Sequence, residues 1–355
     1  MLAPRRCPVT SSDALDALPA GWTLAASSFN WTPEVIRAER SARDIIAGVA
    51  HDGVASVIEL EAGQALRSFP DPTPEELDEL SGALAAAGGR IGIFGASIDD
   101  WNSPTRRRSD DERFEFLLPQ LHAASRLGAL GLRLPLGQAG PALIERLLPL
   151  LHEHDLVLFE EVQGSQTPSS PESAAAYDHL VGLDDPHLRL VLDISMLMPA
   201  LPVTYLERLT AAGLPQAFLS QLTDRWRDPQ TRLAVLALLR EGGVPPHLHT
   251  LYMDMVVRFG RSDVSELADV LPFVSAVHLK FWDLDDQDGR VSDPLRAVGE
   301  ALAGVGFTGT LASEWGGHAW LDDDPTAMTR AHLDLARHSL LVGAARASAA
   351  PQGAR

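Results

Sequence analysis

The chain has 355 residues, of which 45% are hydrophobic and 22% charged, values typical of one large globular domain or two ordinary ones. Its 48 acidic residues outnumber its 29 lysines and arginines, and the net charge of −19 disfavours binding to nucleic acid or to an anionic membrane surface. No apolar run is long enough to cross a membrane, and the one cysteine fits a reducing compartment, so we expect a cytoplasmic protein.

Short apolar runs alternate with longer amphipathic segments along the chain. Each run has strand length, is bounded by turn residues and precedes a helical pattern. One helix start is marked by Thr73-Pro74-Glu75-Glu76, a capping box with proline at the first helical position. In chain order, the predicted strands are 23–30, 55–61, 90–97, 129–136, 155–162, 188–195, 275–282 and 309–315.

Eight strand–helix units predict a (β/α)8 barrel, an α/β fold that takes about 250 residues and accepts insertions. We assign the barrel to residues 21–342 as a single domain, between a flexible leader at 1–20 and a flexible tail at 343–355. The excess length falls at about 196–274, which we interpret as a helical insertion between the sixth and seventh strands. A doubly wound open sheet is the alternative, but no glycine-rich phosphate turn follows the first strand.

Ionisable residues lie near the ends of the last four predicted strands. They are Glu160 and Glu161 on the fifth strand, Asp193 on the sixth, His278 on the seventh and Glu314 on the eighth. Active sites of such barrels lie at this end of the strands, and buried charges are costly unless they are paired or bind a metal. Carboxylates with one imidazole suit Mn²⁺, Mg²⁺, Co²⁺ or Zn²⁺.

The order Glu, Asp, His, Glu resembles the xylose-isomerase-like barrel superfamily of sugar isomerases and epimerases. The stretches that carry the resemblance are FEEVQG (159–164), VLDIS (191–195), VHLKFWD (277–283) and LASEWGG (311–317). The resemblance implies one divalent ion, Mn²⁺ first, bound by Glu161 rather than Glu160, together with Asp193, His278 and Glu314. It also implies that Glu161 and Glu314 act as acid and base.

The His-x-Lys-Phe stretch and the later Ser-Glu-aromatic stretch resemble most closely the catalytic subunits of bacterial C-glycoside deglycosidases. That resemblance implies a 3-keto sugar held by a metal while a base removes the proton beside its carbonyl. The chain departs from the pattern at Gln163, where a histidine is expected, because glutamine cannot act as a general base. We retain Gln163 as a substrate-binding candidate.

Lys280 is the only lysine in the chain. It lies two residues after His278, so the two side chains face the same side of a strand. We predict that Lys280 points inward, has a lowered pKa, and donates a hydrogen bond or a proton to a substrate oxygen. A structural salt bridge to Asp193 or Glu314 is the alternative role, and codon bias with chance is the simplest explanation.

Three further residues are candidates for substrate binding. Arg133 reaches the site from the fourth strand in one interpretation and forms an ion pair with Glu59 or Glu61 in the other. Trp282 and Trp315 follow the last two strands, where aromatic rings either stack on sugars or fill the barrel mouth.

The leading functional hypothesis is a metal-dependent sugar isomerase or epimerase that removes a proton next to a carbonyl. A lyase subunit that cleaves 3-keto glycosides is the second hypothesis, and a non-catalytic barrel that binds a ligand or partner is the third. We expect a sugar or keto-sugar as ligand. A second copy of the chain and a small accessory subunit both remain open as protein partners.

Overall fold

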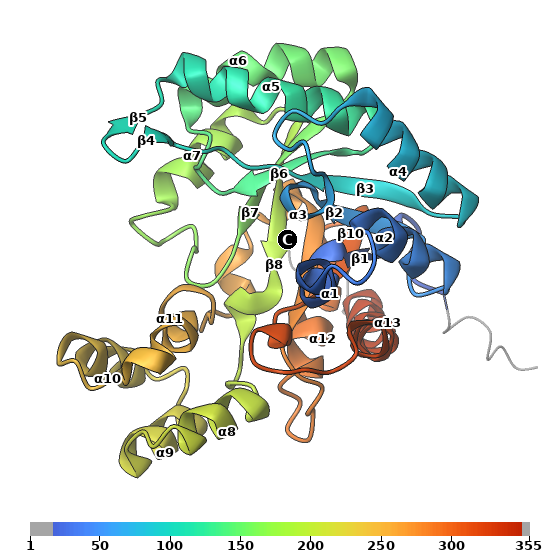
Figure 1. The fold of residues 1–355 in the computed structure, drawn as a ribbon. Helices are drawn as coiled ribbons and strands as arrows, with labels where there is room; N and C mark the ends of the chain where they lie inside the picture. The colour runs from blue at the N-terminus through green and yellow to red at the C-terminus, as the bar shows by residue number, and fades with distance from the viewer. Residues whose placement is uncertain (1–16, 350–355) are drawn as a thin grey trace, which may run out of the picture.

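In a computed structural model that describes residues 17–349, eight parallel strands close into a barrel, so the predicted (β/α)8 fold is confirmed. Going around the barrel, the strand order is β1, β10, β9, β8, β7, β6, β3 and β2 (Figure 1). Each barrel strand overlaps one of the eight predicted runs. A short antiparallel hairpin of β4 and β5 follows β3 outside the barrel.

The strands are bounded as follows: β1 Trp22–Ser27, β2 Val57–Glu61, β3 Arg90–Gly95, β4 Trp101–Ser103, β5 Arg106–Arg107, β6 Gly131–Pro135, β7 Val157–Val162, β8 Leu188–Asp193, β9 Val274–Phe281 and β10 Gly309–Trp315. The helices are α1 Thr32–Arg37, α2 Ala42–His51, α3 Ala62–Ala65, α4 Pro74–Ala86, α5 Asp110–Arg126, α6 Pro141–His154, α7 Ala174–Leu183, α8 Val203–Ala211, α9 Gln216–Asp224, α10 Pro229–Arg240, α11 His249–Val257, α12 Ser292–Gly304 and α13 Pro325–Ala349. None of these helices is both long and apolar enough to span a bilayer.

The main apolar core lies between the barrel strands and the helices around them. It forms because strand residues alternate between the barrel interior and this outer layer, where leucine, isoleucine and valine side chains meet the apolar faces of the helices. Half of the predicted capping box is confirmed, since Thr73 Oγ1 accepts a hydrogen bond of 3.3 Å from the Glu76 backbone N–H. The other half does not form, because the Thr73 backbone N–H donates to Ser68 Oγ at 3.1 Å and the Glu76 carboxylate accepts from Ser68 instead. Polar side chains at the barrel mouth are therefore carried on a rigid, well-packed scaffold.

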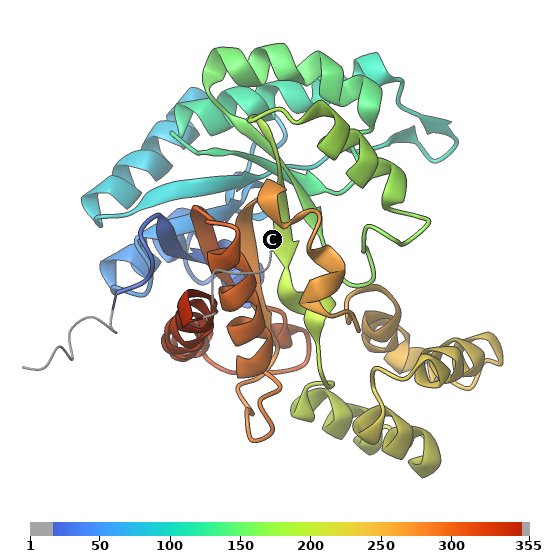
Figure 2. The same cartoon turned by 180° about the vertical axis from the view of Figure 1, so that it is seen from behind.

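Four helices, α8 to α11, lie between β8 and β9 and extend away from the barrel (Figures 1 and 2). They pack around a second apolar cluster, which includes Tyr205, Trp226 and Tyr252. Trp282 and Trp320, which follow the last two barrel strands, belong to the same cluster. Apolar packing thus fixes this helical segment beside the mouth of the barrel.

Helix α13 continues to Ala349, so residues 343–349 are helical, although the sequence analysis assigns them to the tail. Alanine favours helix in this stretch, and tertiary packing adds to it. Gly343 and Ala344 are buried, and a Cβ on Gly343 would lie 2.1 Å from the Arg296 carbonyl oxygen of α12. The missing side chain lets α13 approach α12 closely. The rest of the predicted tail and most of the leader lie outside the described residues.

Candidate metal centre

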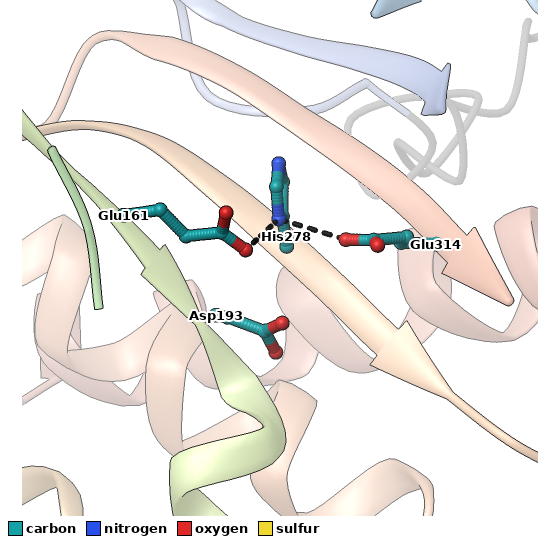
Figure 3. A group of neighbouring side chains, drawn as sticks. All are labelled: Glu161, Asp193, His278 and Glu314. Carbon is teal, nitrogen blue, oxygen red and sulfur yellow. Dashed lines mark hydrogen bonds and ion pairs between the residues drawn. The ribbon is translucent and has the colours of Figure 1, made fainter. Parts of the chain in front are cut away.

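Four side chains from consecutive strands meet at the C-terminal mouth of the barrel. Glu161 lies on β7, Asp193 on β8, His278 on β9 and Glu314 on β10 (Figure 3). Each offers one potential ligand atom, all four atoms lie within 4.8 Å of one another, and all four residues are buried. The strand register helps to produce this arrangement, because Asp193 and His278 are direct partners across β8 and β9.

The alternation of strand residues separates the neighbouring glutamates of β7. Glu161 Oε1 lies 3.0 Å from His278 Nδ1, inside the barrel. Glu160 instead accepts a hydrogen bond of 2.8 Å from the backbone N–H of Gly137, and burial raises the pKa of Glu160 to about 7. Of the two glutamates, Glu161 is the one whose side chain belongs to the four-residue group.

His278 lies at the centre of the negative charge. Its Nδ1 lies 3.0 Å from Glu161 Oε1 and 2.7 Å from Glu314 Oε2, and its Nε2 lies 2.9 Å from Glu59 Oε1. Burial lowers the pKa of His278, but these carboxylates raise it by more, so the pKa lies well above its ordinary value. The group therefore favours a positive charge beside Nδ1, which a proton or a divalent cation can supply.

Arg133 links the four-residue group to two further glutamates on β2. Its Nε donates to Glu59 Oε1 at 2.6 Å, and its terminal nitrogens donate to Glu61 and Glu161. Gly95 leaves room for this arrangement, because a Cβ there would lie 3.2 Å from Arg133 Nη2. The two roles predicted for Arg133 thus occur together, since it pairs with the β2 glutamates and also reaches the mouth.

Lys280 points into the barrel, as the sequence predicts, and its Nζ lies 2.7 Å from Glu314 Oε1. The protein groups around Lys280 shift its pKa in the direction opposite to the one predicted beside a metal ion. Burial lowers the pKa of Lys280, but the carboxylates of Glu314 and Asp193 raise it by more, so the pKa lies above its ordinary value. Lys280 is therefore a charged member of an ion pair.

The donor set fits a hard divalent cation. Bonds of about 2.0–2.3 Å place ligand atoms on opposite sides of such an ion about 4–4.6 Å apart, close to the spacing present here. Burial raises the pKa of Glu161, but Arg133 and His278 lower it to about 2, so its carboxylate is ionised. Glu314 Oε2 is buried, and the polar atom that faces it is His278 Nδ1 at 2.7 Å. Within residues 17–349, no other group of His, Cys, Asp or Glu meets the same spacing.

The remaining predicted site residues lie in different surroundings. Trp315 is fully buried on the outer face of β10, where its Nε1 donates to the Trp282 carbonyl oxygen at 2.9 Å. This position does not suit the substrate contact predicted for Trp315, because its side chain points away from that of the preceding Glu314. Trp282 packs on Phe259 with ring centroids 4.8 Å apart. Gln163 is half-buried in the loop after β7, where its backbone N–H donates to Gln166 Oε1.

A large open cleft lies where α1, α8 and α11 come together, and we call it the mouth cleft; none of the four candidate ligands lines it. It has a volume of about 1080 Å³ and is lined by part of the segment 29–37, by parts of α8 and α11, and by residues 318–320. The Phe29 ring is its link to the charged group, lying 4.8 Å from Lys280 Nζ and 4.6 Å from the His318 ring. The sequence analysis missed Phe29 and His318, although a histidine four residues after Glu314 was a usable signal.

Comparisons with known proteins agree with the resemblance seen in the motifs. The C-glycoside deglycosidase alpha subunit of Arthrobacter globiformis is 26% identical over 329 residues, covering 90% of this chain and 93% of that protein. The 3'-dehydrocarminate deglycosidase alpha subunit of a Microbacterium species is 26% identical over 319 residues, covering 86% and 91%. No protein-family profile matches the chain.

Among solved structures, L-ribulose 3-epimerase has the same barrel fold, with a TM-score of 0.53 and 12% identity over 94% of this chain and 99% of that one. The predicted resemblance to xylose-isomerase-like barrels and to deglycosidase subunits is confirmed. The chain is an enzyme, as its sequence predicts.

Proposed function

We propose that this enzyme cleaves a 3-keto glycoside by elimination, with a divalent ion bound by Glu161, Asp193, His278 and Glu314. The buried four-residue group carries the proposal, and the two deglycosidase relatives support it over the isomerase that the sequence analysis places first. Mn²⁺ is the first candidate, and Mg²⁺, Co²⁺ and Zn²⁺ suit the same ligands. When bound, such an ion supplies positive charge that stabilises an enolate oxygen.

The contacts of the two glutamates divide their roles. Both oxygens of Glu161 are occupied, Oε1 by His278 and Oε2 by Arg133, so we assign Glu161 mainly to holding the ion. Glu314 contacts Lys280 through Oε1 and His278 Nδ1, at 2.7 Å, through Oε2, and it lacks the arginine that fixes Glu161, so we assign Glu314 as the proton acceptor. Lys280, beside it, is placed to donate a proton to a substrate or leaving-group oxygen.

In the proposed reaction, Glu314 removes the proton on sugar carbon C2, which the ketone at C3 makes acidic. The electron pair of that C–H bond forms the C1=C2 double bond, and the bond from C1 to the aglycone breaks. The aglycone leaves with the electron pair of the broken C1–aglycone bond and is protonated through Lys280. No oxidant or reductant is consumed, because the ketone is already present in the substrate.

One substrate can distinguish the elimination from the isomerisation. The 3-oxo derivative of phenyl β-D-glucoside should release phenol in the presence of Mn²⁺ but not after chelation, as measured by absorbance. An Asp193→Asn variant should lose most of this activity. An isomerised or epimerised sugar that retains phenol, detected by NMR, would support the isomerase instead, and no reaction of any kind would contradict both.

We infer that the enzyme works with a protein partner, because the names of both relatives describe alpha subunits. A second copy of this chain and a small accessory subunit are the two candidates. Mass measurement of the assembly purified from its native cells distinguishes them. A lone chain with full activity would contradict the inference.

A further inference from the structure

A second pocket lies between the loop after β7, the start of α10 and the segment that follows α11. It has a volume of about 530 Å³ and shares no lining residue with the mouth cleft or with the four-residue group. Its lining includes Arg227, Arg232 and Arg261 together with five serine and threonine residues. We call it the arginine pocket, and it is separate from the proposed reaction centre.

Arg261 is held rigidly in the wall of this pocket by Trp226. The guanidinium carbon of Arg261 lies 3.4 Å from the centre of the Trp226 ring, and its Nε donates to the Trp226 carbonyl oxygen at 3.0 Å. The Nη2 atom of Arg261 is buried and has no hydrogen-bond partner among residues 17–349. Because a buried donor without a partner is costly, this guanidinium group favours an additional acceptor.

The charge of Arg261 is opposed by a like charge and is not neutralised by a carboxylate. Burial, with a smaller contribution from the charge of Arg232, lowers the pKa of Arg261 to about 10, so Arg261 is still a cation at neutral pH. Arg232 is exposed on the first turn of α10. In the part of the chain that the structure describes, no carboxylate lies within 4.0 Å of either guanidinium group. An anion bound between the two would relieve their repulsion.

The other charged groups of the lining are already engaged within the protein. Glu172 accepts a hydrogen bond of 2.8 Å from the Ser170 hydroxyl, and Glu266 accepts one of 2.8 Å from the Asp263 backbone N–H. Arg227 donates to three backbone carbonyl oxygens. The remaining two arginines therefore give the pocket positive charge that the lining carboxylates do not pair with, in a chain whose net charge is −19.

The donors of the pocket suit a phosphate group. Guanidinium groups bind phosphate through paired N–H donors, and hydroxyls donate single hydrogen bonds to the same oxygens. Two of the lining hydroxyls, Thr167 Oγ1 and Ser169 Oγ, lie 3.1 Å apart. The volume of about 530 Å³ falls within the range of about 300–1,000 Å³ for small-molecule sites, so a phosphate group fits together with part of a molecule that carries it.

We propose that the arginine pocket binds a phosphate group through Arg232, Arg261 and the lining hydroxyls. The group is either free phosphate or the phosphate of a small monoester, since the same donors recognise both. This site goes beyond the proposed function and does not depend on it, because none of the four candidate metal ligands lines the pocket.

Calorimetry with the full chain, loaded with Mn²⁺ and kept at constant ionic strength with chloride, tests the proposal with two probes, inorganic phosphate and glycerol 3-phosphate. We expect both to bind, and the double variant Arg232→Met/Arg261→Met to bind each at least ~10-fold more weakly, the value of one charge-assisted contact. Binding should persist after chelation, which excludes Mn²⁺ as the binding partner. Tighter binding of the ester would identify a phosphorylated molecule as the ligand, and equal affinities would identify free phosphate.

The single variant Arg232→Met should also weaken binding, and its folding should be unaffected because Arg232 is exposed. Arg232→Lys should recover part of the affinity, since it keeps the charge. Arg240→Met is the matched control, because Arg240 is exposed at the end of the same helix and does not line the pocket. No binding of either probe, loss of binding on chelation, unchanged affinity in the double variant, or equal weakening by Arg240→Met would overturn the proposal.

Discussion

Lys280 and Glu314 are direct register partners on β9 and β10, and their side chains form a buried ion pair of 2.7 Å. Gly316 leaves room for the lysine stem, since a Cβ there would lie 3.2 Å from Lys280 Cε. The Phe29 ring covers the ammonium group at 4.8 Å. A compact cation fits this enclosure, whereas the wider guanidinium group of arginine does not.

Lys280→Arg keeps a positive charge beside Glu314, so the protein should still fold and bind metal, but the displaced guanidinium group should reduce turnover by ~10²–10⁴-fold, the contribution typical of a positioned proton donor. Lys280→Met should also lose activity. It should in addition destabilise the chelated protein by about 3–5 kcal/mol, because Glu314 would be buried without its cation. Turnover of the 3-oxo phenyl glucoside and urea unfolding measure the two effects, and parent turnover by Lys280→Arg would show that lysine itself is dispensable.

Glu161→Gln should reduce metal content well below one ion per chain, whereas Glu160→Gln should retain it. The reason is orientation, since Glu161 faces His278 and Glu160 faces the backbone of Gly137. Elemental analysis of both proteins, purified without chelator, provides the measurement. Loss of metal from Glu160→Gln alone, or equal metal content in the two variants, would be incompatible with the proposed centre.

Glu59→Gln should weaken metal binding by about 10–100-fold, the usual effect of removing a partner that orients a histidine ligand. Glu59 accepts from His278 Nε2, which leaves Nδ1 to face the other carboxylates. Glu61→Gln is the matched control, because Glu61 also pairs with Arg133 but forms no ion pair with His278. Titration of chelated protein with Mn²⁺ gives both affinities, and unchanged affinity in Glu59→Gln would refute the role of Glu59.

His332 in α13 should make the protein less stable in acid. It is buried between the Ser313 hydroxyl, 2.8 Å from Nδ1, and the Phe281 ring, and burial lowers its pKa to about 3. The unfolded chain binds a proton near the ordinary histidine pKa of about 6.5. The stability from His332 is thus complete above pH ~6.5 and is lost as the pH falls toward 3, by at most about 4–5 kcal/mol.

Chemical unfolding of His332→Phe across this pH range measures the contribution. The variant keeps an aromatic ring against Phe281 but cannot titrate, so its free energy of unfolding should decrease less steeply in acid. His338→Phe is the control, because His338 is exposed on the same helix. If the free energies of unfolding of the parent and of His332→Phe fall in parallel as the pH decreases, His332 makes no contribution to acid instability and the prediction is wrong.

The sequence was sufficient for the features that depend on strand periodicity. The period of two places His278 and Lys280 on one face and separates Glu161 from Glu160, and both arrangements occur in the structure. The same rule, applied to Glu314 and Trp315, would have shown that the tryptophan faces outward. The substrate contact of Trp315 therefore stays a prediction that its outward position does not favour.

Other features depend on contacts that no local pattern contains. The raised pKa of Lys280 follows from its pairing with Glu314, which requires the register between β9 and β10. The mouth cleft joins Phe29, Arg208 and Arg258, which are far apart in sequence. The helical nature of residues 343–349 depends on close packing of Gly343 against α12, and sequence composition alone had suggested a tail.

The second apolar cluster, around α8 to α11, has an evolutionary consequence. Barrel folding relies on one set of buried side chains and the helices beside the mouth rely on another, with only a few residues such as Trp282 and Trp320 at the boundary. Mutations in α8 and α11 can therefore accumulate and alter the mouth without first disrupting the inherited catalytic strands. Enzymes encoded by descendants of such a gene can therefore change their substrate specificity while keeping the same reaction chemistry.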